Sequence, residues 1–379
     1  MDAVVVGAGI GGLAAAVALR RVGWDVTVLE RSAELGEVGA GLTLWPNALR
    51  ALAAIGVGEA VRAVSVPAGA GAGLRNPAGR VLLRAPDVVA DMRALHRADL
   101  QSALLAALPA DTVRTDCAVT RVVDEGVIAG DEPIPADLIV AADGIHSTVR
   151  RQLWPGSEPR YSGYSAWRGV TARHTVTISG SADTGETWGR GERFGIVSLP
   201  DGGAYWFAAA NEPPDRRYPD EHAEVLRRFG SWHWPIPTVL AATVPSAVLH
   251  HDIVELPALP TYVSGHVALL GDAAHAMTPD LGQGGCQALE DAVVLASCVA
   301  GLDIGGSAVP PALSRYDTLR RPRTQEIARL ASRLGRVGQA DGVVGSRLRT
   351  AGLRMAPQRL MLRAQARITD WTPPTLGSG

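Results

Sequence analysis

The first thirty residues combine a short apolar run, a glycine-rich turn, a helix-compatible stretch and a second apolar run. The run Ala3–Val6 has the length and composition of a buried parallel strand. It leads through the turn GAGIGG at 7–12 into an expected helix at 13–21, and a second expected strand, Asp25–Leu29, ends at Glu30. This order of elements predicts the unit that opens a dinucleotide-binding fold.

Each glycine of this turn has a physical role in such a fold. Gly7 permits the tight turn, Gly9 lets the backbone approach a pyrophosphate, and Gly12 lets the helix pack closely on the strand. The N-terminus of the helix that follows offers free N–H groups and the positive end of the dipole to the phosphates. Glu30 follows Gly12 by 18 positions, close to the expected place of the acidic residue that binds a ribose hydroxyl.

The stretch 3–19 holds no charge, so a signal peptide or a membrane span is the competing interpretation. A signal peptide begins with basic residues, whereas the only early charge here is Asp2. A span needs about 20 apolar residues, and glycines interrupt this run. We therefore expect no membrane partner and, without an export signal, a cytoplasmic location.

Composition narrows the possible chemistry. The 379 residues carry a net charge of −2 and are 47% hydrophobic, which is typical of a globular protein without a nucleic-acid partner. Cys117, Cys286 and Cys298 show no CxxC spacing, so we expect neither a disulfide framework nor a metal site. The chain contains no lysine, which excludes a pyridoxal-phosphate Schiff base and a P-loop.

The pattern along the chain predicts an interrupted nucleotide-binding domain. Apolar runs at 3–6, 25–29, 138–142 and 266–270 are expected to form one sheet. Between the last two, the stretch 154–259 is rich in tryptophan, proline and short β-like runs, which indicates an inserted, largely antiparallel sheet. A helix is expected at 285–300, followed by a mostly helical, arginine-rich remainder.

Two later motifs begin where expected strands end, at the sheet edge that ligands favour. They are DGIHSTVR at 143–150 and GDAAH at 271–275, which continues to PDLGQGGC at 279–286. With the glycine turn and Glu30, they occur in the order seen in the FAD-dependent aromatic hydroxylases, the group A flavoprotein monooxygenases. The chain resembles this family, which includes salicylate hydroxylase, 6-hydroxynicotinate 3-monooxygenase and the urate hydroxylases, over about residues 1–330.

The resemblance implies an α/β fold with a Rossmann-like FAD-binding domain, an inserted mainly antiparallel substrate domain and a C-terminal helical region. The expected boundaries are 1–155 and 262–330 for the discontinuous FAD-binding domain, 156–261 for the substrate domain and 331–379 for the helical region and tail. Residues 65–95 are expected to contribute to the substrate side.

The resemblance also implies how FAD, bound non-covalently, is held. Glu30 would hold the adenosine ribose, Arg97 would lie near the phosphates, and Asp143 near the pyrophosphate, where it helps the nicotinamide cofactor to bind. Asp272 would bond the ribityl chain, although its residue type alone also suits a helix cap. Residues 282–286 would pass under the flavin at a helix N-terminus, whose dipole stabilises the negative charge of reduced flavin. The full expected set is Gly7, Gly9, Gly11, Gly12, Glu30, Arg31, Thr43, Arg97, Asp143, Gly144, Asp272, Pro279, Gly282, Gln283, Gly284, Gly285 and Cys286.

The implied activity is an NADH- or NADPH-consuming monooxygenase that hydroxylates an electron-rich small aromatic or heteroaromatic substrate with O2, through a flavin C4a-hydroperoxide. No protein acid or base is assigned. A flavin oxidase or dehydrogenase and a non-catalytic redox sensor on the same scaffold remain alternatives. The WxWxIP match at 232–237 is typical of flavin-dependent halogenases, but those enzymes need a lysine. We therefore expect Trp232 and Trp234 to be packing residues.

Arg193 is the expected polar anchor of the substrate, because it aligns with a substrate-binding arginine of the urate hydroxylases. The alternative is a surface arginine beside Glu192. Where those enzymes have a substrate-binding tyrosine, the alignment places Trp206, next to Tyr205. Since Trp206 donates one hydrogen bond and accepts none, we expect a more apolar ring than urate, stacked on Trp206 or Tyr205.

The remaining polar clusters are expected to be structural. His250 and His251 are neighbours on an expected strand and should face opposite ways, which argues against a metal site. The C-terminal arginines are expected to form a solvated helix face; they are Arg320, Arg321, Arg323, Arg329, Arg333 and Arg336. The chain is expected to be a monomer or a homodimer.

Overall fold

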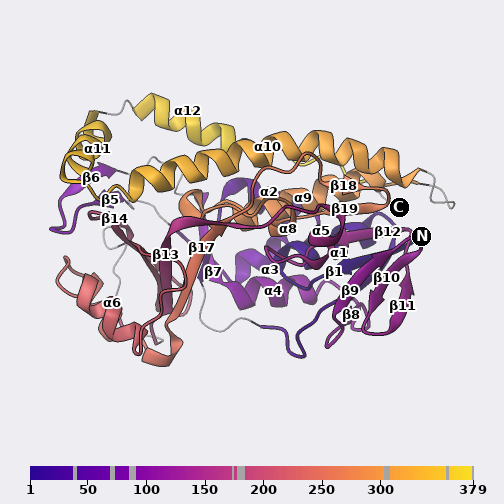
Figure 1. The fold of residues 1–379 in the computed structure, drawn as a ribbon, viewed down its shortest axis with the longest axis horizontal. Coiled ribbons are helices and arrows are strands. Elements are labelled where there is room, and N and C mark those ends of the chain that lie inside the picture. Colours follow the sequence, from indigo (N-terminus) through magenta and orange to yellow (C-terminus); the bar gives the residue numbers. More distant parts are fainter. Residues whose placement is uncertain are drawn as a thin grey trace.

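The computed structural model describes residues 1–36, 41–68, 73–84, 91–172, 175–176, 184–302, 308–355 and 358–377. The chain forms an N-terminal part built on a largely parallel sheet, a large second sheet and a C-terminal helical region that runs along both (Figure 1).

The first layer is a six-stranded sheet with the N-terminal strand inside it. Its order is β18-β19-β12-β1-β2-β8. The strands are β1 (Asp2–Val6), β2 (Asp25–Leu29), β8 (Val113–Arg114), β12 (Leu138–Ala141), β18 (Val263–Ser264) and β19 (Val267–Leu269). Strand β1 pairs in parallel with β2 and β12, and β12 pairs in parallel with β19. The four apolar runs expected to share a sheet therefore do so.

Helices cover this sheet and leave the carboxyl ends of its strands for loops. They are α1 (Ile10–Arg21), α2 (Pro46–Ala54), α3 (Gly58–Ala63), α4 (Arg97–Leu105), α5 (Thr148–Leu153), α8 (Asp272–His275) and α9 (Gly284–Val299). The small residues 14–16 of α1 are fully buried. A Cβ on Gly11 would lie 2.8 Å from the Leu270 side chain and 3.2 Å from Ala288 of α9. Small residues thus allow the close packing of α1 and α9 in the main core.

The second layer is a seven-stranded sheet of order β17-β13-β16-β15-β14-β5-β6. Its strands are β5 (Gly73–Arg75), β6 (Val81–Arg84), β13 (Arg160–Val170), β14 (Gly185–Trp188), β15 (Glu192–Ser198), β16 (Ala204–Asn211) and β17 (Leu249–Glu255). All neighbouring pairs are antiparallel except β14 with β5. The mainly antiparallel sheet predicted for the inserted stretch is therefore present.

Two further, smaller sheets are present. One is a meander of β9 (Val119–Val123), β10 (Gly126–Ala129) and β11 (Glu132–Pro135). The other joins β3 (Gly41–Leu44), β4 (Val66–Pro67) and β7 (Arg93–His96) in the order β3-β7-β4.

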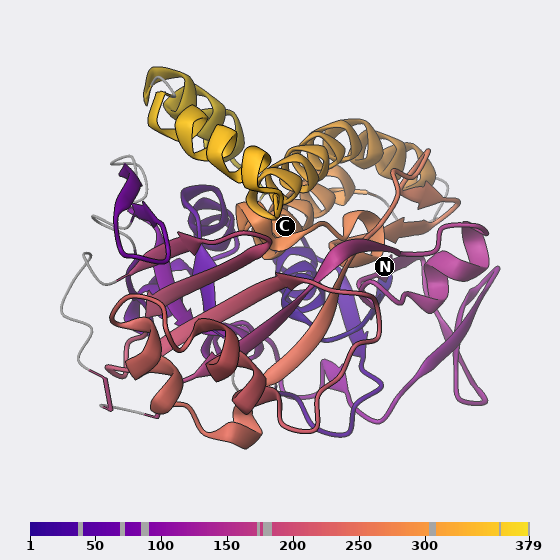
Figure 2. The ribbon, with the colours of Figure 1, turned by 60° about the vertical axis from the view of Figure 1, so that its left-hand side comes forward.

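The outer face of the large sheet is covered by two helices that the sequence pattern did not predict, α6 (Glu221–Phe229) and α7 (Ile236–Ala241) (Figure 2). Helix α6 begins at Asp220, whose side chain accepts a hydrogen bond from the N–H of Ala223. The even-numbered residues of β16 pack with these helices in a second core. The opposite, inner face of the large sheet turns toward the first part of the chain, since Tyr205 of β16 lies beside Gly41.

The C-terminal region consists of α10 (Val309–Gly338), α11 (Val343–Met355) and α12 (Gln358–Thr369). Helix α10 packs on α9 and extends to the large sheet, where Leu334 contacts a cluster around Trp188 (Figure 1). After α12 the chain returns to the main core, and Arg50 donates hydrogen bonds to the carbonyls of Thr369 and Trp371. No helix of the described residues is long and apolar enough to cross a membrane.

Candidate active site

The glycine turn is tightly packed on one side and open on the other. Gly7 has φ = +102°, and a Cβ there would lie 2.6 Å from the carbonyl oxygen of Ala142. A Cβ on Gly12 would collide with the carbonyl oxygen of Gly7. By contrast, a Cβ on Gly9 would meet no described atom within 4 Å. Glycine is thus required inside the turn, and the backbone at Gly9 is accessible to a ligand.

The carboxylate of Glu30 lies directly beside this turn, at the end of β2. It accepts hydrogen bonds from the N–H of Ala8 at 2.7 Å and of Ser32 at 2.9 Å. Gln101 of α4 donates to the carbonyl oxygen of Ala8, so the helix that begins at Arg97 also contacts the turn. Arg31, next along the chain, is exposed.

Asp143 follows β12 and lies on the other side of Gly7, whose Cβ position is 3.2 Å from the Asp143 Cα. Its carboxylate accepts hydrogen bonds from the N–H groups of Thr148 at 2.7 Å and Val149 at 3.3 Å, at the start of α5. Gly144 has φ = +78° and turns the chain there. Asp143 thus fixes the loop beside the glycine turn.

Asp272 is exposed at the first position of α8, and no described residue donates a hydrogen bond to its carboxylate. The N-cap position belongs to Gly271, so the helix-cap alternative is not supported. One carboxylate oxygen lies 3.8 Å from the Cβ position of Gly284, the first residue of α9. Asp272 therefore faces the N-terminus of α9.

That N-terminus follows a short 3₁₀ turn, η3 (Pro279–Leu281). Gly282 has φ = +60°, with its Cβ position 3.0 Å from the indole nitrogen of Trp45. Gln283 is buried and accepts hydrogen bonds from Asn47 and Gln287, while its own Nε2 has no partner among the described residues.

Strand β3, which carries Thr43, passes beside this loop, since Leu42 lies 3.9 Å from the Cβ position of Gly285. Cys286 is buried in the first turn of α9. Burial raises the pKa of its thiol to about 12, so this thiol is protonated at neutral pH. Cys286 therefore contributes packing and no thiolate chemistry.

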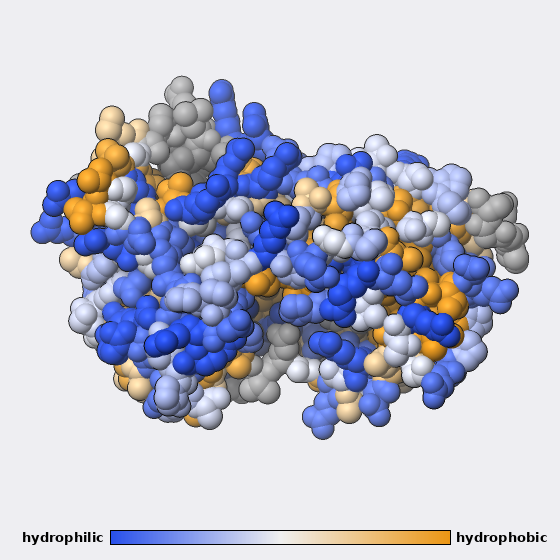
Figure 3. All heavy atoms as spheres, in the orientation of Figure 1, coloured by the Kyte–Doolittle hydropathy of each residue, from blue (hydrophilic) through white to orange (hydrophobic). Residues whose placement is uncertain are grey.

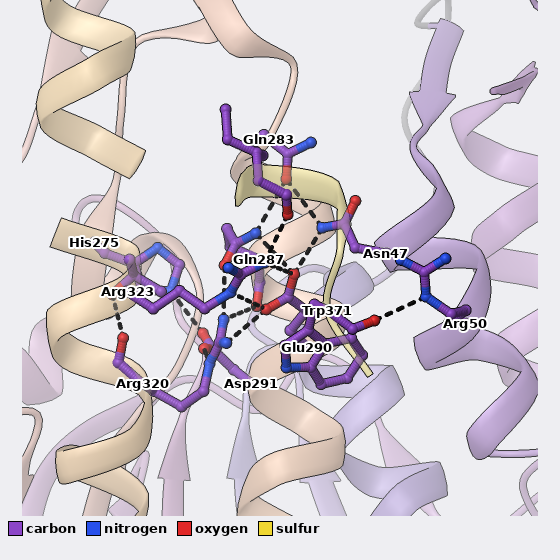
Figure 4. A network of polar contacts seen from close by, with 12 residues as sticks. Asn47, Arg50, His275, Gln283, Gln287, Glu290, Asp291, Arg320, Arg323 and Trp371 are labelled. Carbon is purple, nitrogen blue, oxygen red and sulfur yellow. Dashed lines mark hydrogen bonds and ion pairs between the residues drawn. The ribbon is translucent and has the colours of Figure 1, made fainter. Parts of the chain in front are cut away.

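A buried polar network anchors the base of α9 (Figure 4). Arg320 of α10 pairs with Glu290 and Asp291, each at 2.6 Å. Arg323 also pairs with Glu290, at 2.7 Å, and His275 contacts Asp291 at 2.6 Å. Asn47 joins Glu290 to Gln283, so the network reaches the loop at 282–286.

The prediction that the C-terminal arginines form a solvated face is therefore wrong for Arg320, which is 1% exposed, and for Arg323. Helix α10 lies against α9, and the two buried carboxylates of α9 need cationic partners. Arg329, Arg333 and Arg336 are exposed, as expected.

Arg193 lies on the inner face of the large sheet and is 3% exposed, so the surface alternative is wrong. Its guanidinium pairs with Asp280 of η3 at 2.6 Å and with Glu186 at 3.5 Å. Its Nε donates to Gln339 at 3.2 Å, and the ring of Tyr164 lies 5.5 Å away. Burial alone would lower the pKa of Arg193, but the two carboxylates raise it, so the group stays cationic.

Of the two residues expected to stack on a substrate ring, Trp206 and Tyr205, Trp206 faces away from Arg193. Arg193 pairs with Ala209 across the ladder, so the odd-numbered residues of β16 share its face and Trp206 lies on the other. Trp206 is fully buried in the second core, stacks on Phe194 and donates a hydrogen bond to Thr243. Tyr205 is the member of the pair that faces inward, toward Gly41.

Tyr205 also belongs to a cationic environment. Burial raises its pKa, while the charges of Arg168 and Arg97 act in the opposite direction. Arg97, expected near the FAD phosphates, follows His96, which pairs with Gly41 between β7 and β3, and Gly41 lies beside Tyr205, so Arg97 also lies near the inner face of the sheet.

Sequence reasoning missed Asp280, Glu186 and Tyr164. Asp280 lies inside the PDLGQGGC motif, but only the tertiary structure shows that it pairs with Arg193 and accepts a hydrogen bond from Tyr164 at 2.8 Å. A cavity of about 770 Å³ opens next to this cluster, lined by Tyr164, Gln339 and polar residues of β13 and α10.

The other predicted features lie away from this region. His250 stacks on Trp167 at 4.2 Å on the outer face, whereas His251 pairs with Ala166 on the inner one. No group of three or more potential metal ligands occurs within the described part of the chain. Trp232 packs against Phe229, but Trp234 is 58% exposed, so the packing prediction is wrong for Trp234.

The observed site fits FAD. The open backbone at Gly9 suits a pyrophosphate, the carboxylate of Asp272 has no protein partner among the described residues, and the buried Nε2 of Gln283 lacks an acceptor there. These features define a flavoprotein with a Rossmann-like cofactor site.

Comparisons with known proteins give the family. Residues 1–331 match the FAD binding domain family, and the chain belongs to it as an FAD-dependent monooxygenase. It is similar to aurachin C monooxygenase/isomerase of Stigmatella aurantiaca, 38% identical over 98% of this chain and 99% of the relative. It is also similar to 2-heptyl-3-hydroxy-4(1H)-quinolone synthase of Pseudomonas aeruginosa, 32% identical over 97% of each chain. The structure of Klebsiella pneumoniae HpxO complexed with FAD and uric acid has a TM-score of 0.88, with 28% identity over 99% of this chain and 97% of that one.

The first prediction concerns Asp272. Asp272→Ala should weaken FAD binding by about 10–150-fold, because a hydrogen bond to a charged group contributes about 1.5–3 kcal/mol. Fluorescence titration of the apoprotein with FAD measures this change, and circular dichroism checks the fold. The matched control is Glu59→Ala, which removes a carboxylate that is 96% exposed on α3. An unchanged FAD affinity in Asp272→Ala would mean that Asp272 does not touch the cofactor.

Proposed function

We propose that the protein hydroxylates an electron-rich, fused nitrogen heteroaromatic ring, with 4-quinolones as the leading class. The balanced reaction converts a ring C–H, O2, NAD(P)H and a proton into a ring C–OH, water and NAD(P)+. When bound, FAD would carry electrons from NAD(P)H and activate O2 as the electrophile. One relative aligned over nearly its whole length supports this class, since the Pseudomonas enzyme is named for a 4-quinolone with a hydroxyl at position 3.

The observation that carries the proposal is the ion pair of Arg193 with Asp280. Asp280 lies in η3, directly before the loop at 282–286 that fits the flavin, whereas Arg193 projects from the large sheet. The pair therefore joins the sheet face that would hold a substrate to the loop that would hold the cofactor.

The chemistry of Arg193 suits the oxygen of a 4-quinolone. A guanidinium has five N–H groups. The contacts to Asp280, Glu186 and Gln339 use one each, so two N–H groups remain to donate hydrogen bonds to a substrate. Donation to the 4-oxygen favours the anionic form, which is the electron-rich state that attacks an electrophilic oxygen. Tyr205, which faces the same side, supplies an aromatic surface against which the bicyclic ring can pack.

The test is a screen for substrate-stimulated NAD(P)H consumption under labelled oxygen. A 4-quinolone should accelerate NAD(P)H oxidation and yield a product that carries one labelled oxygen atom. A product without the label would indicate an oxidase or dehydrogenase, and no turnover with any aromatic compound would favour the redox-sensor alternative. Turnover of urate or an aminohydroxybenzoate, but of no quinolone, would support monooxygenase activity and overturn the proposed substrate class.

The second prediction concerns Arg193. Arg193→Met should raise the KM for the stimulating substrate by about 10–150-fold, because a charged hydrogen bond is lost. FAD should stay bound, since the variant leaves the glycine turn and Asp272 untouched. Arg190→Met is the matched control, because Arg190 is exposed on the turn just before β15. If Arg193→Met retains the parent KM and rate, the anchor of the substrate lies elsewhere.

A further inference from the structure

Helix α11 exposes an apolar stripe. Val344, Leu348 and Met355 are 70%, 68% and 81% exposed. Their spacings of four and seven residues place them on one face of the helix, together with Ala351. A stripe of large apolar side chains on a surface helix marks an interaction site more often than a lone exposed residue does.

The opposite face of α11 already holds the helix on the protein. Leu353 packs against the cluster around Trp188, and Ser346 is buried. Arg349 donates hydrogen bonds to the carbonyl oxygens of Gly338 and Gly189. The apolar stripe therefore points away from the protein because the helix is docked through its other side.

Arginines dominate the charge around this stripe. The segment 342–369 contains six arginines and no acidic residue. Arg347, one position before Leu348, is exposed beside the stripe. Arg333 and Arg336 of α10 are exposed close by in the chain, and Figure 3 shows apolar residues at the α11 end next to strongly hydrophilic ones over α10. An apolar stripe flanked by arginines is the pattern of a helix that lies in a membrane interface.

We propose that α11 docks the protein on an anionic lipid surface, with Val344, Leu348 and Met355 inserted at headgroup level and the surrounding arginines paired with lipid phosphates. The sequence alone led us to expect no membrane partner, and the exposure of these three side chains changes that expectation. An anionic lipid surface offers an apolar layer for the stripe and phosphates for the arginines, whereas a nucleic acid offers phosphates but no apolar layer. The proposal is independent of the proposed substrate.

The FAD-loaded protein should be mixed with vesicles of phosphatidylcholine alone and of phosphatidylcholine with phosphatidylglycerol, and bound protein measured by co-sedimentation. The test variant combines Val344→Ser, Leu348→Ser and Met355→Ser. The matched control combines Val244→Ser and Leu319→Ser, two exposed apolar residues on other elements. Bound FAD and circular dichroism check that each variant is folded.

The parent and the control should bind the anionic vesicles and only weakly the neutral ones. The triple variant should lose about tenfold or more in affinity, because burial of each apolar side chain in the interface contributes to binding. Absence of binding to anionic vesicles would overturn the proposal. Unchanged binding of the triple variant would also overturn it, because charge alone would then explain the binding. A third contrary result is a parent protein that binds no vesicles but forms a dimer, which the triple variant does not form.

Discussion

Arg320→Met should lower the free energy of unfolding by about 3–5 kcal/mol, the usual effect of breaking a buried ion pair. Arg320 is 1% exposed and reaches Glu290 and Asp291 at 2.6 Å each. Methionine fills much of the volume but leaves Asp291 with His275 as its remaining ion-pair partner within the described part of the chain. Glu290 keeps Arg323, so the loss falls mainly on Asp291.

Urea unfolding of the FAD-free protein measures this effect without a contribution from cofactor affinity. Arg321→Met is the matched control at the next position, because Arg321 is 32% exposed and pairs with Asp317 on the same helix. Such a partly exposed pair contributes about 0.3–0.5 kcal/mol. Equal losses in the two variants would show that the buried network does not stabilise the fold.

Arg320→Met should also change how the free energy of unfolding depends on pH. Burial alone would raise the pKa of Asp291, but the charges of His275 and Arg320 hold it at about 2, below its ordinary value of 3.8. The stability that comes from this carboxylate is therefore complete above about pH 4 and disappears as the pH falls through 2. Without Arg320 the pKa of Asp291 rises, so acid unfolding should begin at a higher pH.

Asp280→Asn should reduce stability by about 3 kcal/mol and raise the KM of the substrate by about tenfold or more. The substitution keeps the shape of the side chain but leaves the buried charge of Arg193 with Glu186 alone, at 3.5 Å. The guanidinium should then shift toward Glu186 and lose its orientation. The kcat should change less than KM, because Asp280 positions the anchor and does not itself touch the reacting ring.

Steady-state kinetics and urea unfolding together test this prediction. Asp341→Asn is the matched control, because Asp341 lines the same cavity but is exposed and contacts Asn211 at 3.3 Å. Unchanged KM and stability in Asp280→Asn would show that the ion pair does not position Arg193.

The sequence predicted most of the fold because strand burial and special backbone angles leave local signals. Four apolar runs identified the central strands, and Gly7 and Gly12 marked a turn that other residues could not form. Helices α6 and α7 were missed because tryptophans and prolines dominated the interpretation of that stretch. The cap Asp220 was nevertheless present in the sequence.

The predicted site contains errors because strand register and contacts between residues far apart in the sequence cannot be seen in the local pattern. The alignment placed Trp206 against a substrate, but the strand register sends its side chain to the opposite face from Arg193. Arg320 looked like the other arginines of its helix, and only the packing of α10 on α9 buries it. The partner of Arg193 could not be predicted either, because Asp280 is 87 positions away in sequence.

Helix α10 has a consequence for how the protein moves. Its 30 residues span about 45 Å, with Arg320 tied to the cofactor side and Gln339, its C-terminal cap, tied to Arg193 on the substrate sheet. The helix therefore links the cofactor side to the substrate sheet through contacts near both of its ends. A large hinge closure around the ligands would break contacts at one end of this helix. We therefore expect access and product release to depend on local movements of loops and ligands rather than on rotation of whole domains.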